Sequence, residues 1–381
     1  MQTPRDVTLA ELAGPDAAAA LARLRAHAPV TRLAELDGWL VTGHAPALAV
    51  MRDAAHFTVA DPRFSTARVV GASMLSTDGA EHRRHRRPFA APFRAAELEQ
   101  RFGGEVARLA TGLVARLRPA RAADLRTEFA GPLSTAVVAH TLGLRDIDVP
   151  TVLGWYAAIV AAVTALSAGD RPTGEEIAAM RDLAVAVRGG LGHDASSVLT
   201  GARGSLRDDE IVANAAVMMF GGIETTEGMI ANLVTHLLAD PAALDRVRVE
   251  PDLVPVAVEE SLRLEPAAAV VDRYATADVV LAGAAIAAGD LVRVSLAAAN
   301  RDPAVFDRPD EFELDRANSR SQLAFARGPH ACIAMDLARL ETRVGLGALL
   351  DGLPGLRPVA PAAAAGLVFR KPAAVRVHWD F

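Results

Sequence analysis

The chain has 381 residues, a formal net charge of −6 and a single cysteine, Cys332. The acidic charge argues against nucleic-acid binding as the main role, and one cysteine excludes an intramolecular disulfide framework and favours a reducing compartment. Met1–Arg5 show no basic-then-apolar signal pattern, so we expect a cytoplasmic protein. Hydrophobic residues make up 51%, which is enough for a large core.

Most of the chain is patterned as helix, and the first strand signal comes near the N-terminus. Val30–Leu33 and Trp39–Thr42 are joined by ELDG, which predicts a β-hairpin. Farther along, Val279–Leu281 and Leu291–Val294 are expected to form a second pair of short strands, and apolar alternation returns near the C-terminus in VRVHWDF. The pattern therefore predicts a mainly α protein with small β-sheets.

The stretch DGAEHRRHRRPF, Asp78 to Phe89, is a charge run on a predicted helix. His82 and Arg86 are four residues apart and therefore share one helix face. Such a run is usually a solvated surface, but it also suits an anion or an acidic partner. Aromatic residues do not interleave with the charges, so nucleic-acid binding is disfavoured here.

The segment Thr151–Gly169, TVLGWYAAIVAAVTALSAG, contains 19 residues without a charge, which is long enough to span a membrane. Alanine dominates the segment, Asp148 and Asp170 flank it, and no basic cluster sets an orientation. A buried helix is the preferred interpretation.

A longer helix is expected from about Glu210 to Leu238. Ser205 followed by Asp208–Asp209 indicates its start, because acidic residues are favoured at the positive end of a helix dipole. A helix of this length exceeds the usual globular range. It is therefore expected to cross the whole core.

The middle of that helix reads MMFGGIETTEGMI. Gly221 and Gly222 are poor helix residues, and Glu224 and Thr225 follow them directly. A buried threonine can hydrogen-bond to a carbonyl one turn earlier and open the helix locally. Taken alone, the stretch predicts either a kink beside an exposed acid or a widened groove in which Glu224 and Thr225 handle protons.

The stretch VEESLR places Glu260 and Arg263 three residues apart on one helix face, where they can form an ion pair. Taken alone, this is the pattern of an ordinary surface salt bridge.

The stretch FARGPHACIAMDLARLE holds Cys332 between a predicted turn at Gly328–Pro329 and an amphipathic helix. A helix N-terminus stabilises a thiolate, and a thiolate is a soft ligand for iron. A lone cysteine is otherwise a small buried hydrophobe.

These motifs occur together and in order, and as a set they resemble the cytochromes P-450, which are heme-thiolate monooxygenases. The matching features are Asp78…His82…Arg86, the acid–threonine helix, Glu260–Arg263, and F-x-x-G-x-H-x-C followed by L-A-R-x-E. Ala299–Arg316 also resembles the stretch that leads into the heme loop. The resemblance covers nearly the whole chain and implies one cytochrome P-450 domain over residues 1–381, with a long central helix over the heme.

Two positions depart from the family pattern. Ala326 and Ala334 stand where glycine is usual. Both residues are small, so the backbone should still approach a porphyrin closely, although the loop could shift and change the tuning of the heme.

The resemblance implies a set of heme-binding residues. Cys332 is the expected metal ligand, to the iron of heme b. Arg86, Arg273 and His330, with His82 as a fourth, match the positions that neutralise the two propionates, since buried carboxylates need cationic partners. Glu260 and Arg263, with Arg316, become structural residues that hold the heme loop. Phe325 is expected to pack beside the sulfur.

The resemblance also assigns the catalytic side. Gly221–Gly222 leave space above the iron, Thr225 is expected to hydrogen-bond dioxygen or a nearby water, and Glu224 is expected to feed protons. The acid–threonine pair favours a monooxygenase over a peroxide-using relative. Because the chain ends at Phe381, a separate ferredoxin and its reductase are the implied electron donors. The hypothesis is that three arginines steer an acidic ferredoxin: Arg83, Arg84 and Arg87.

Substrate contacts are expected from small apolar residues. The candidates are Gly221 of the long helix, Ala268 and Val270 in the stretch 267–271, and Val368 in the stretch 367–369. The stretches 64–74 and 151–169 are expected to form the roof. The prediction is a roomy apolar pocket for a bulky nonpolar metabolite, such as a terpenoid or a polyketide, that is hydroxylated or epoxidised in bacterial secondary metabolism. Genome composition is an equal explanation for the many alanines.

Three alternatives stay open. The first is a heme-thiolate enzyme that performs oxidative coupling or peroxide-driven oxidation. The second is a non-catalytic heme sensor, which the Glu224–Thr225 pair disfavours. The third, a heme-free helical protein, requires every motif match to be accidental.

Overall fold

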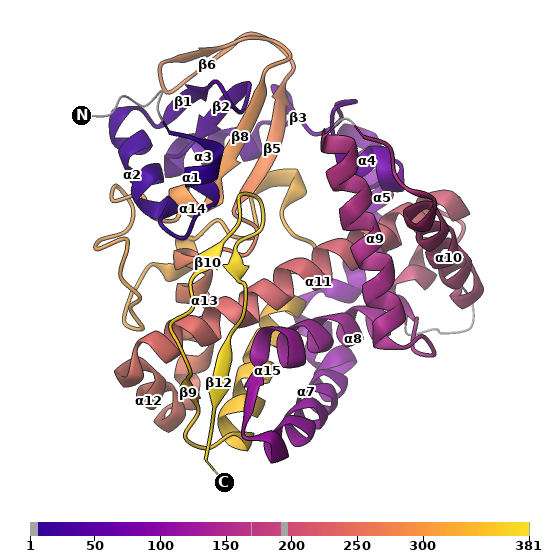
Figure 1. Ribbon diagram of the computed structural model, residues 1–381. Coiled ribbons are helices and arrows are strands. Elements are labelled where there is room, and N and C mark those ends of the chain that lie inside the picture. The colour runs from indigo at the N-terminus through magenta and orange to yellow at the C-terminus, as the bar shows by residue number, and fades with distance from the viewer. Residues whose placement is uncertain (1–6, 169, 192–196, 381) are drawn as a thin grey trace.

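The computed structural model describes residues 7–168, 170–191 and 197–380. Met1–Arg5 and Gly169, the last residue of the apolar segment Thr151–Gly169, therefore lie outside the described residues. One part of the molecule, the sheet-bearing part, holds the strands between Val30 and Thr58 and between Val270 and Ser295, and the other part is mainly helical with a few short strands (Figure 1). The longest helix, α11 (Asp208–Ala239), runs through the middle of the view and joins the two parts.

The described α-helices are α1 Leu9–Ala13, α2 Ala17–His27, α3 His44–Arg52, α4 Ser65–Val70, α5 Gly79–Ala90, α6 Ala95–Leu98, α7 Gly104–Leu117, α8 Gly131–Leu142, α9 Val149–Ala168, α10 Gly174–Gly190, α11 Asp208–Ala239, α12 Pro241–Val249, α13 Val254–Leu264, α14 Leu296–Ala299 and α15 Met335–Gly352. The described strands are β1 Val30–Leu33, β2 Gly38–Val41, β3 Phe57–Thr58, β4 Ala122–Asp124, β5 Val270–Ala275, β6 Val279–Leu281, β7 Ala284–Ile286, β8 Leu291–Ser295, β9 Arg357–Pro358, β10 Ala364–Ala365, β11 Lys371–Pro372 and β12 Arg376–His378.

The strands form four small sheets, the largest with the order β1-β2-β8-β5-β3. The predicted N-terminal hairpin is confirmed, since β1 pairs antiparallel with β2 from Val30 opposite Val41 to Leu33 opposite Gly38. The C-terminal alternation is confirmed as β12, which pairs with β4 and β9. A mainly α fold with small sheets is therefore the observed architecture.

The second predicted strand pair is wrong. β6 pairs with β7, whereas β8 pairs with β2 and β5. The reason is the turn between Leu281 and Ala284, where Ala282 and Gly283 both adopt positive φ, 49° and 86°. Two consecutive left-handed residues make a two-residue hairpin turn, so the chain reverses at once and β8 is left free to join the main sheet.

Helix α11 spans Asp208–Ala239, close to the expected range. It packs against α8, α13, α15 and α10 and has buried residues along its whole length. The expected start signal is only partly right: the N-cap position is Arg207 instead of Ser205, and the Arg207 N–H donates to Glu210 Oε2 at 2.9 Å.

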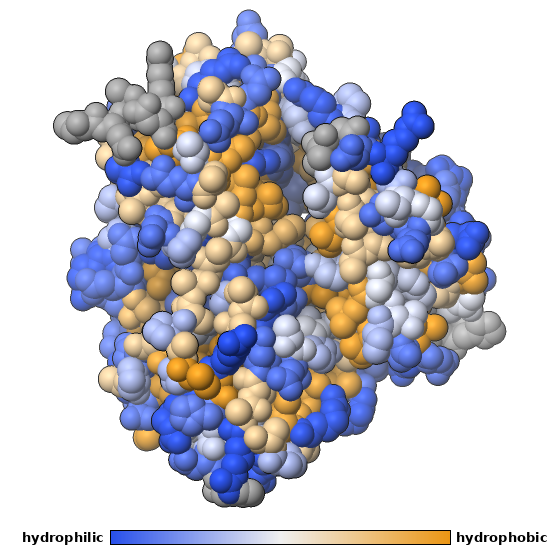
Figure 2. Space-filling model, viewed as in Figure 1, coloured by the Kyte–Doolittle hydropathy of each residue, from blue (hydrophilic) through white to orange (hydrophobic). Residues whose placement is uncertain are grey.

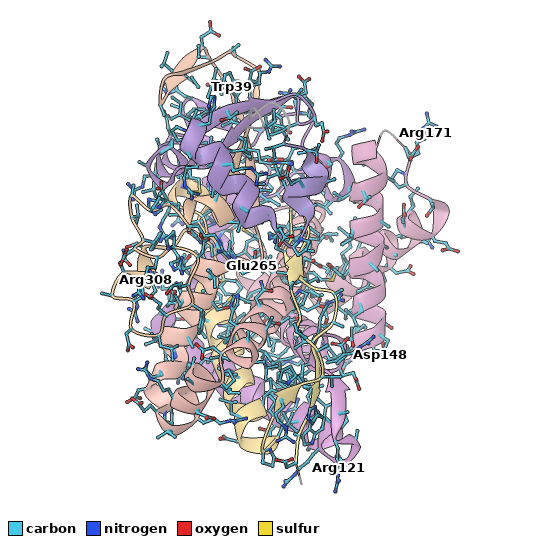
Figure 3. All side chains as sticks on the ribbon, turned by 60° about the vertical axis from the view of Figure 1, so that its left-hand side comes forward. Trp39, Arg121, Asp148, Arg171, Glu265 and Arg308 are labelled. Carbon is cyan, nitrogen blue, oxygen red and sulfur yellow. The ribbon has the colours of Figure 1, made fainter. Side chains whose placement is uncertain are left out.

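Helix α9 does not match the expectation of a buried helix. It is the one described helix long and apolar enough, by length and composition, to cross a membrane, yet only 22% of its window Val149–Leu166 is buried. Val152, Trp155, Ile159 and Ala162 form its buried stripe. In Figure 3, Asp148 and Arg171 mark the two ends of this helix along the outside of the molecule.

A buried ion-pair cluster fastens the segment after α14 to α13. Arg263 donates to both oxygens of Glu260 at 2.8 Å, and Arg316 Nε donates to Glu260 Oε1 at 2.9 Å. Arg263 also donates to the carbonyls of Asn300, Pro309 and Glu311. The side chains of Glu260 and Arg263 are fully buried. The predicted structural role of this pair agrees with its contacts.

Candidate functional site

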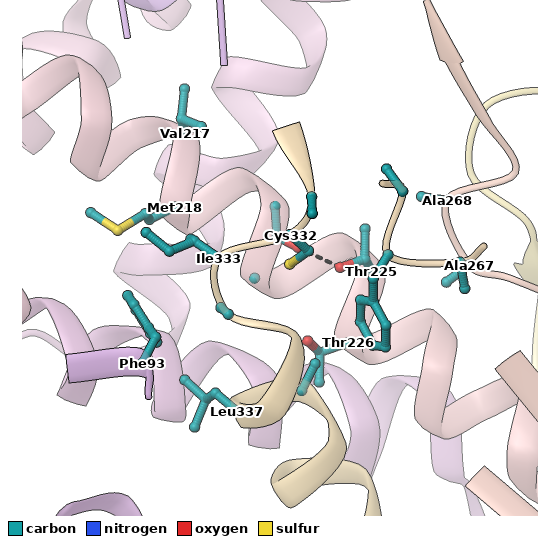
Figure 4. A pocket seen from close by; sticks show the side chains of 18 of the residues that line it. Phe93, Val217, Met218, Thr225, Thr226, Ala267, Ala268, Cys332, Ile333 and Leu337 are labelled. Atoms are coloured by element: carbon teal, nitrogen blue, oxygen red, sulfur yellow. Dashed lines mark hydrogen bonds between the residues drawn. The ribbon is translucent and has the colours of Figure 1, made fainter. Parts of the chain in front are cut away.

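A cavity of about 270 Å³ lies between α11 and the loop that precedes α15 (Figure 4). Side chains of α8, α13, β5 and α15 complete its walls. Among the described residues, its only titratable lining groups are Arg86, His330, Cys332 and Glu341. The molecular surface is hollowed between the sheet-bearing part and α9, and apolar side chains gather there (Figure 2).

Cys332 reaches the cavity from a loop with a fixed backbone. Its N–H donates to the carbonyl of Phe325 at 2.8 Å. Gly328 has a φ of +78°, and a Cβ there would overlap the carbonyl oxygen of Met51. Only glycine fits at such a place. The loop therefore aims the cysteine through hydrogen bonds and close packing against α3.

Ala326 and Ala334 differ in what they demand of the backbone. Ala326 has a φ of +56°, in the left-handed region that glycine adopts without strain. Ala334 has a φ of −102°, which suits any residue. The replacement of the family's usual glycine therefore strains the loop at the first position and not at the second.

The pKa of the Cys332 thiol does not follow the simple expectation from a helix N-terminus. Burial raises it, and the hydrogen bond from the Ala334 N–H and the charge of Arg86 only partly oppose that effect. A bound metal deprotonates a coordinating thiol outright. The protein alone therefore holds a thiol, and ligation would supply the thiolate.

Four cationic or hydrogen-bonding side chains gather beside this loop. Arg86 donates to the carbonyl of Ala331 at 2.7 Å, and the ring of His82 lies 4.3 Å from that of His330. Nε2 of His82 is buried without a hydrogen-bond partner in the described part of the chain. Arg273 is 5% exposed and donates only to its neighbour's carbonyl among the bonds found.

Burial disfavours the charged forms of these side chains. It lowers the pKa of Arg86 and of Arg273, and it lowers the pKa of His82 to about 4, with the nearby charges of His330 and Arg86 adding to the effect. Buried donors without anions require acceptors. The chemistry of this group therefore fits the two carboxylates of a heme.

Asp78 is a member of this group whose role the sequence did not reveal. Its carboxylate accepts from His330 Nε2 at 2.7 Å, from the Thr58 hydroxyl at 2.6 Å and from the Val59 N–H at 2.8 Å. Although burial opposes them, these bonds hold the pKa of Asp78 well below its ordinary value. Only the other ring nitrogen of His330, Nδ1, is left to face a propionate.

The adjacent glycines of α11, Gly221 and Gly222, have different roles. A Cβ at Gly222 would lie 2.6 Å from Cγ2 of Val138, so this glycine lets α11 approach α8. A Cβ at Gly221 would meet nothing within 4 Å, because that position faces the cavity. Thr225 donates to the carbonyl of Gly221 at 2.5 Å, the predicted bond one turn back, and points to the same space as Cys332 (Figure 4).

Glu224 is not among the cavity-lining residues, which departs from the expectation that it directly serves the space beside Thr225. Its Oε1 pairs with Lys371 Nζ at 2.9 Å, and its Oε2 accepts a hydrogen bond from the Tyr156 hydroxyl. Neither partner was identified from sequence. Lys371 stands out only as the sole lysine, and Tyr156 lies in an apolar stretch.

Glu341 is a second acid that sequence reasoning passed over. It lines the cavity, is 2% exposed, and its Oε2 has no hydrogen-bond partner among the described residues. Burial raises the pKa of this carboxyl well above the ordinary value, which favours its protonated form.

The substrate-residue predictions divide evenly. Gly221 and Ala268 line the cavity. Val270 does not, because alternation along β5 turns Val271 into the cavity instead. Val368 is 39% exposed and also lies outside the lining.

The two predicted roof segments contribute little. From the stretch 64–74, only Met74 lines the cavity, and no residue of the described part of 151–169 does. The apolar walls come instead from α11, which the sequence connected to the pocket, and from α8, which it did not.

The three arginines proposed to steer a partner are not equivalent. Arg83 and Arg87 are exposed. Arg84 donates to Glu210 at 3.0 Å and to Glu81 at 3.1 Å. It holds α5 to the start of α11 and is not free to dock another protein.

The sequence and the fold were compared with known proteins. Residues 194–352 match the family model described as Cytochrome P450. A relative from Streptomyces fradiae, 20-oxo-5-O-mycaminosyltylactone 23-monooxygenase, is 34% identical over 374 residues, which cover 93% of this chain and 86% of the relative.

Two solved structures illustrate the agreement in fold. CalO2 superposes with a TM-score of 0.88 at 30% identity, covering 100% of this chain and 98% of its own. CxnD, titled a cytochrome P450 enzyme for C–S bond formation in chuangxinmycin biosynthesis, superposes with a TM-score of 0.86 at 27% identity, covering 99% and 98%.

Proposed function

The chain belongs to the cytochrome P450 family and is a heme b monooxygenase, and from that premise we propose that it hydroxylates or epoxidises a bulky apolar small molecule in bacterial secondary metabolism. The observation that carries this proposal is the lining of the cavity. Apart from four titratable groups and three threonines, every lining residue is apolar or glycine. Such a wall offers shape and burial instead of a charge anchor, which suits a nonpolar substrate.

The proposal assigns the heme to specific residues. Cys332 would ligate the iron, and Phe325 would pack beside the sulfur. The guanidinium of Arg339 lies over the Phe325 ring, 4.6 Å from its centroid. Arg86, Arg273 and the two histidines, His82 and His330, would pair with the propionates. When bound, the heme supplies the iron chemistry that activates dioxygen.

The remaining catalytic roles fall to α11. Thr225 holds a proton at Oγ1 and can present it to the cavity by exchanging the Gly221 carbonyl for another acceptor. Glu224 would supply protons to that hydroxyl or to a water beside it. Gly221 keeps the wall open where the substrate and dioxygen must meet.

Electron delivery is proposed to come from a separate ferredoxin and its reductase, in the cytoplasm, and the chain is proposed to act as one domain over residues 1–381. With Arg84 committed to Glu210 and Glu81, the steering patch reduces to Arg83 and Arg87. Replacing both with Gln should slow ferredoxin-driven reduction at low salt and not at high salt.

Oxidative coupling is the second candidate. It is favoured by the similarity to CxnD, which is titled for C–S bond formation. An apolar wall serves coupling as well as oxygen insertion, so the product must decide between them.

The experiment that tests the proposal is a binding and product assay on the purified holoenzyme. The reduced, carbon monoxide-bound protein should give the strongly red-shifted Soret band of a thiolate ligand, and Cys332→Ser should lose it. Terpenoids and polyketides should then shift the Soret band of the resting enzyme, whereas small polar compounds should not. Tight binding of polar compounds alone would contradict an apolar substrate, and a coupled product without added oxygen would favour the second candidate.

A further inference from the structure

The sole lysine of the chain lies beside two acids in the middle of α11. The chain has 40 basic residues besides histidine, and 39 of them are arginine. Lys371 begins β11, and its Nζ lies 2.9 Å from Glu224 Oε1 and 2.9 Å from Glu227 Oε2. The three side chains are 15%, 10% and 9% exposed, respectively. One ammonium therefore bridges two nearly buried carboxylates.

Each carboxylate also has a second partner. Glu224 accepts from the Tyr156 hydroxyl of α9. Glu227 accepts from Arg126 Nε at 2.7 Å, and Arg126 in turn donates to the carbonyl of Ala373 at 2.6 Å. Two acids thus face two cations and one phenol, and the group is electrically balanced.

The helix geometry explains why Glu224 misses the cavity. Residues three apart share a helix face, so Glu224 and Glu227 both lie on the side of α11 that meets β11. Thr225 is the next residue around the helix and lines the cavity. Glu224 can reach that space only by leaving Lys371 and Tyr156.

Glu227 makes that departure feasible. A buried ammonium that loses its only carboxylate is strongly destabilised, but Lys371 retains Glu227 when Glu224 turns away. Lysine suits the role because its ammonium is a point charge on a flexible stem, whereas arginine binds a carboxylate through a rigid fork.

Resting on the proposed proton-supplying role of Glu224, we propose that Lys371 is a positioning residue that holds Glu224 outside the cavity and shares its charge with Glu227 so that Glu224 can be released. Tyr156 adds a second hold from α9. The two carboxylates therefore compete for Lys371. A change that weakens the Lys371–Glu227 ion pair strengthens the Lys371–Glu224 pair. A change that strengthens the Lys371–Glu227 pair weakens the Lys371–Glu224 pair.

The competition predicts opposite effects for two substitutions at one ion pair. Glu227→Gln leaves Glu224 as the only carboxylate for Lys371, and turnover should fall roughly tenfold, the scale of one hydrogen bond to a charged group, with a larger solvent deuterium isotope effect. Arg126→Gln leaves Glu227 wholly to Lys371, so turnover should equal or exceed that of the unaltered enzyme. A merely structural cluster would lose activity in both variants, and that result would overturn the proposal.

A spectroscopic test does not depend on turnover. In the ferrous, carbon monoxide-bound holoenzyme grown with lysine labelled at Cε with carbon-13, the sole lysine gives one resonance. Glu224→Gln and Glu227→Gln should each move this resonance, and Glu175→Gln, an exposed acid on α10, should not. If neither acid moves it, Lys371 does not bridge them and the proposal fails. If both move it while Glu224→Gln leaves turnover and its isotope effect unchanged, the hold exists but the proton-supplying role of Glu224 fails.

Discussion

Two buried polar clusters of this molecule differ in whether the protein alone completes them. Around Glu260, two arginines and a set of backbone carbonyls satisfy one another, with Glu260 and Arg263 fully buried. Beside Cys332, His82 Nε2 has no partner in the described chain, and Arg86 and Arg273 meet carbonyls in place of carboxylates. Buried polar groups are normally paired. The first cluster is therefore architecture, and the second is a site that awaits anions.

The comparison also explains why equal burial does not mean equal function. Removing one member of a complete cluster leaves a buried charge unpaired and destabilises the protein. Removing one member of an incomplete cluster removes a buried group that has no partner, so it does not destabilise the heme-free protein and weakens only heme binding. The first three predictions below test that difference, and the fourth tests the loop between the clusters.

The largest effect is expected at the complete cluster. Glu260→Gln should lower the free energy of unfolding by about 3–5 kcal/mol, because buried Arg263 loses its carboxylate and Arg316 keeps only Glu313. Chemical denaturation of the holoenzyme measures the change. Glu97→Gln, which removes an exposed partner of Arg94 at 4.0 Å, is the control and should change stability by less than about 0.5 kcal/mol. A similar loss in both variants would contradict the distinction.

The next effect is a pH dependence of the heme-free protein. The pKa of His82 is about 4 in the folded chain and about 6.5 when unfolded, so the unfolded state binds the proton more tightly. Stability is complete above pH 6.5 and declines as the pH falls toward 4, by up to about 3 kcal/mol from this group. His82→Gln should remove that part of the decline.

A second histidine, His236, provides the internal control for that titration. Burial lowers the pKa of His236 to about 3, so some acid sensitivity should survive the His82 substitution. Denaturation midpoints at several pH values measure both parts. An unchanged decline in His82→Gln would mean that this ring is not buried neutral.

A smaller effect is expected at Arg273. Arg273→Met should weaken heme binding roughly ten- to hundredfold, since a hydrogen bond to a charged group contributes about 1.5–3 kcal/mol. The heme-free protein should keep or gain stability, because the buried guanidinium has no carboxylate partner there. Heme transfer to an acceptor protein measures the loss of heme affinity. Denaturation of the heme-free form measures its change in stability. A loss of both heme affinity and heme-free stability would mean that Arg273 has a structural role, like the residues around Glu260.

The smallest effect concerns the loop at Ala326. Ala326→Gly should raise the free energy of unfolding by about 0.5–1 kcal/mol. The substitution removes the strain of a left-handed alanine, about 1–2 kcal/mol, but glycine also raises the entropy of the unfolded chain, which cancels part of that stabilisation. Ala334→Gly is the matched control and should lower stability, since its φ of −102° carries no such strain. Thermal unfolding of both variants decides the point.

Local pattern was enough for much of the fold and the site. The spacing of Glu260 and Arg263 predicts their pairing, and the four-residue spacing of His82 and Arg86 places them on one face of α5. Both are consequences of helix geometry within a single element. Ordered motifs then identify the family and with it heme b, and they carry the proposal that Cys332 is the iron ligand.

Other features depended on partners far away in the chain. Val271 and not Val270 faces the cavity because the register of β5 against β8 selects the face. α9 lies half exposed because α10, α4 and α8 cover only one side of it. Asp78 binds His330 across 252 positions, which no local spacing encodes.

What the sequence determined by itself is the set of elements and the chemistry they carry: periodicity fixes helices and strands, and residue types fix a thiolate ligand, cationic partners and an acid–alcohol pair. Only the tertiary structure decided which groups are satisfied and where the acid points. Glu224 turns to Lys371, and not to the cavity, because a buried carboxylate takes the nearest cation, and that cation comes from a strand 147 residues farther along the chain.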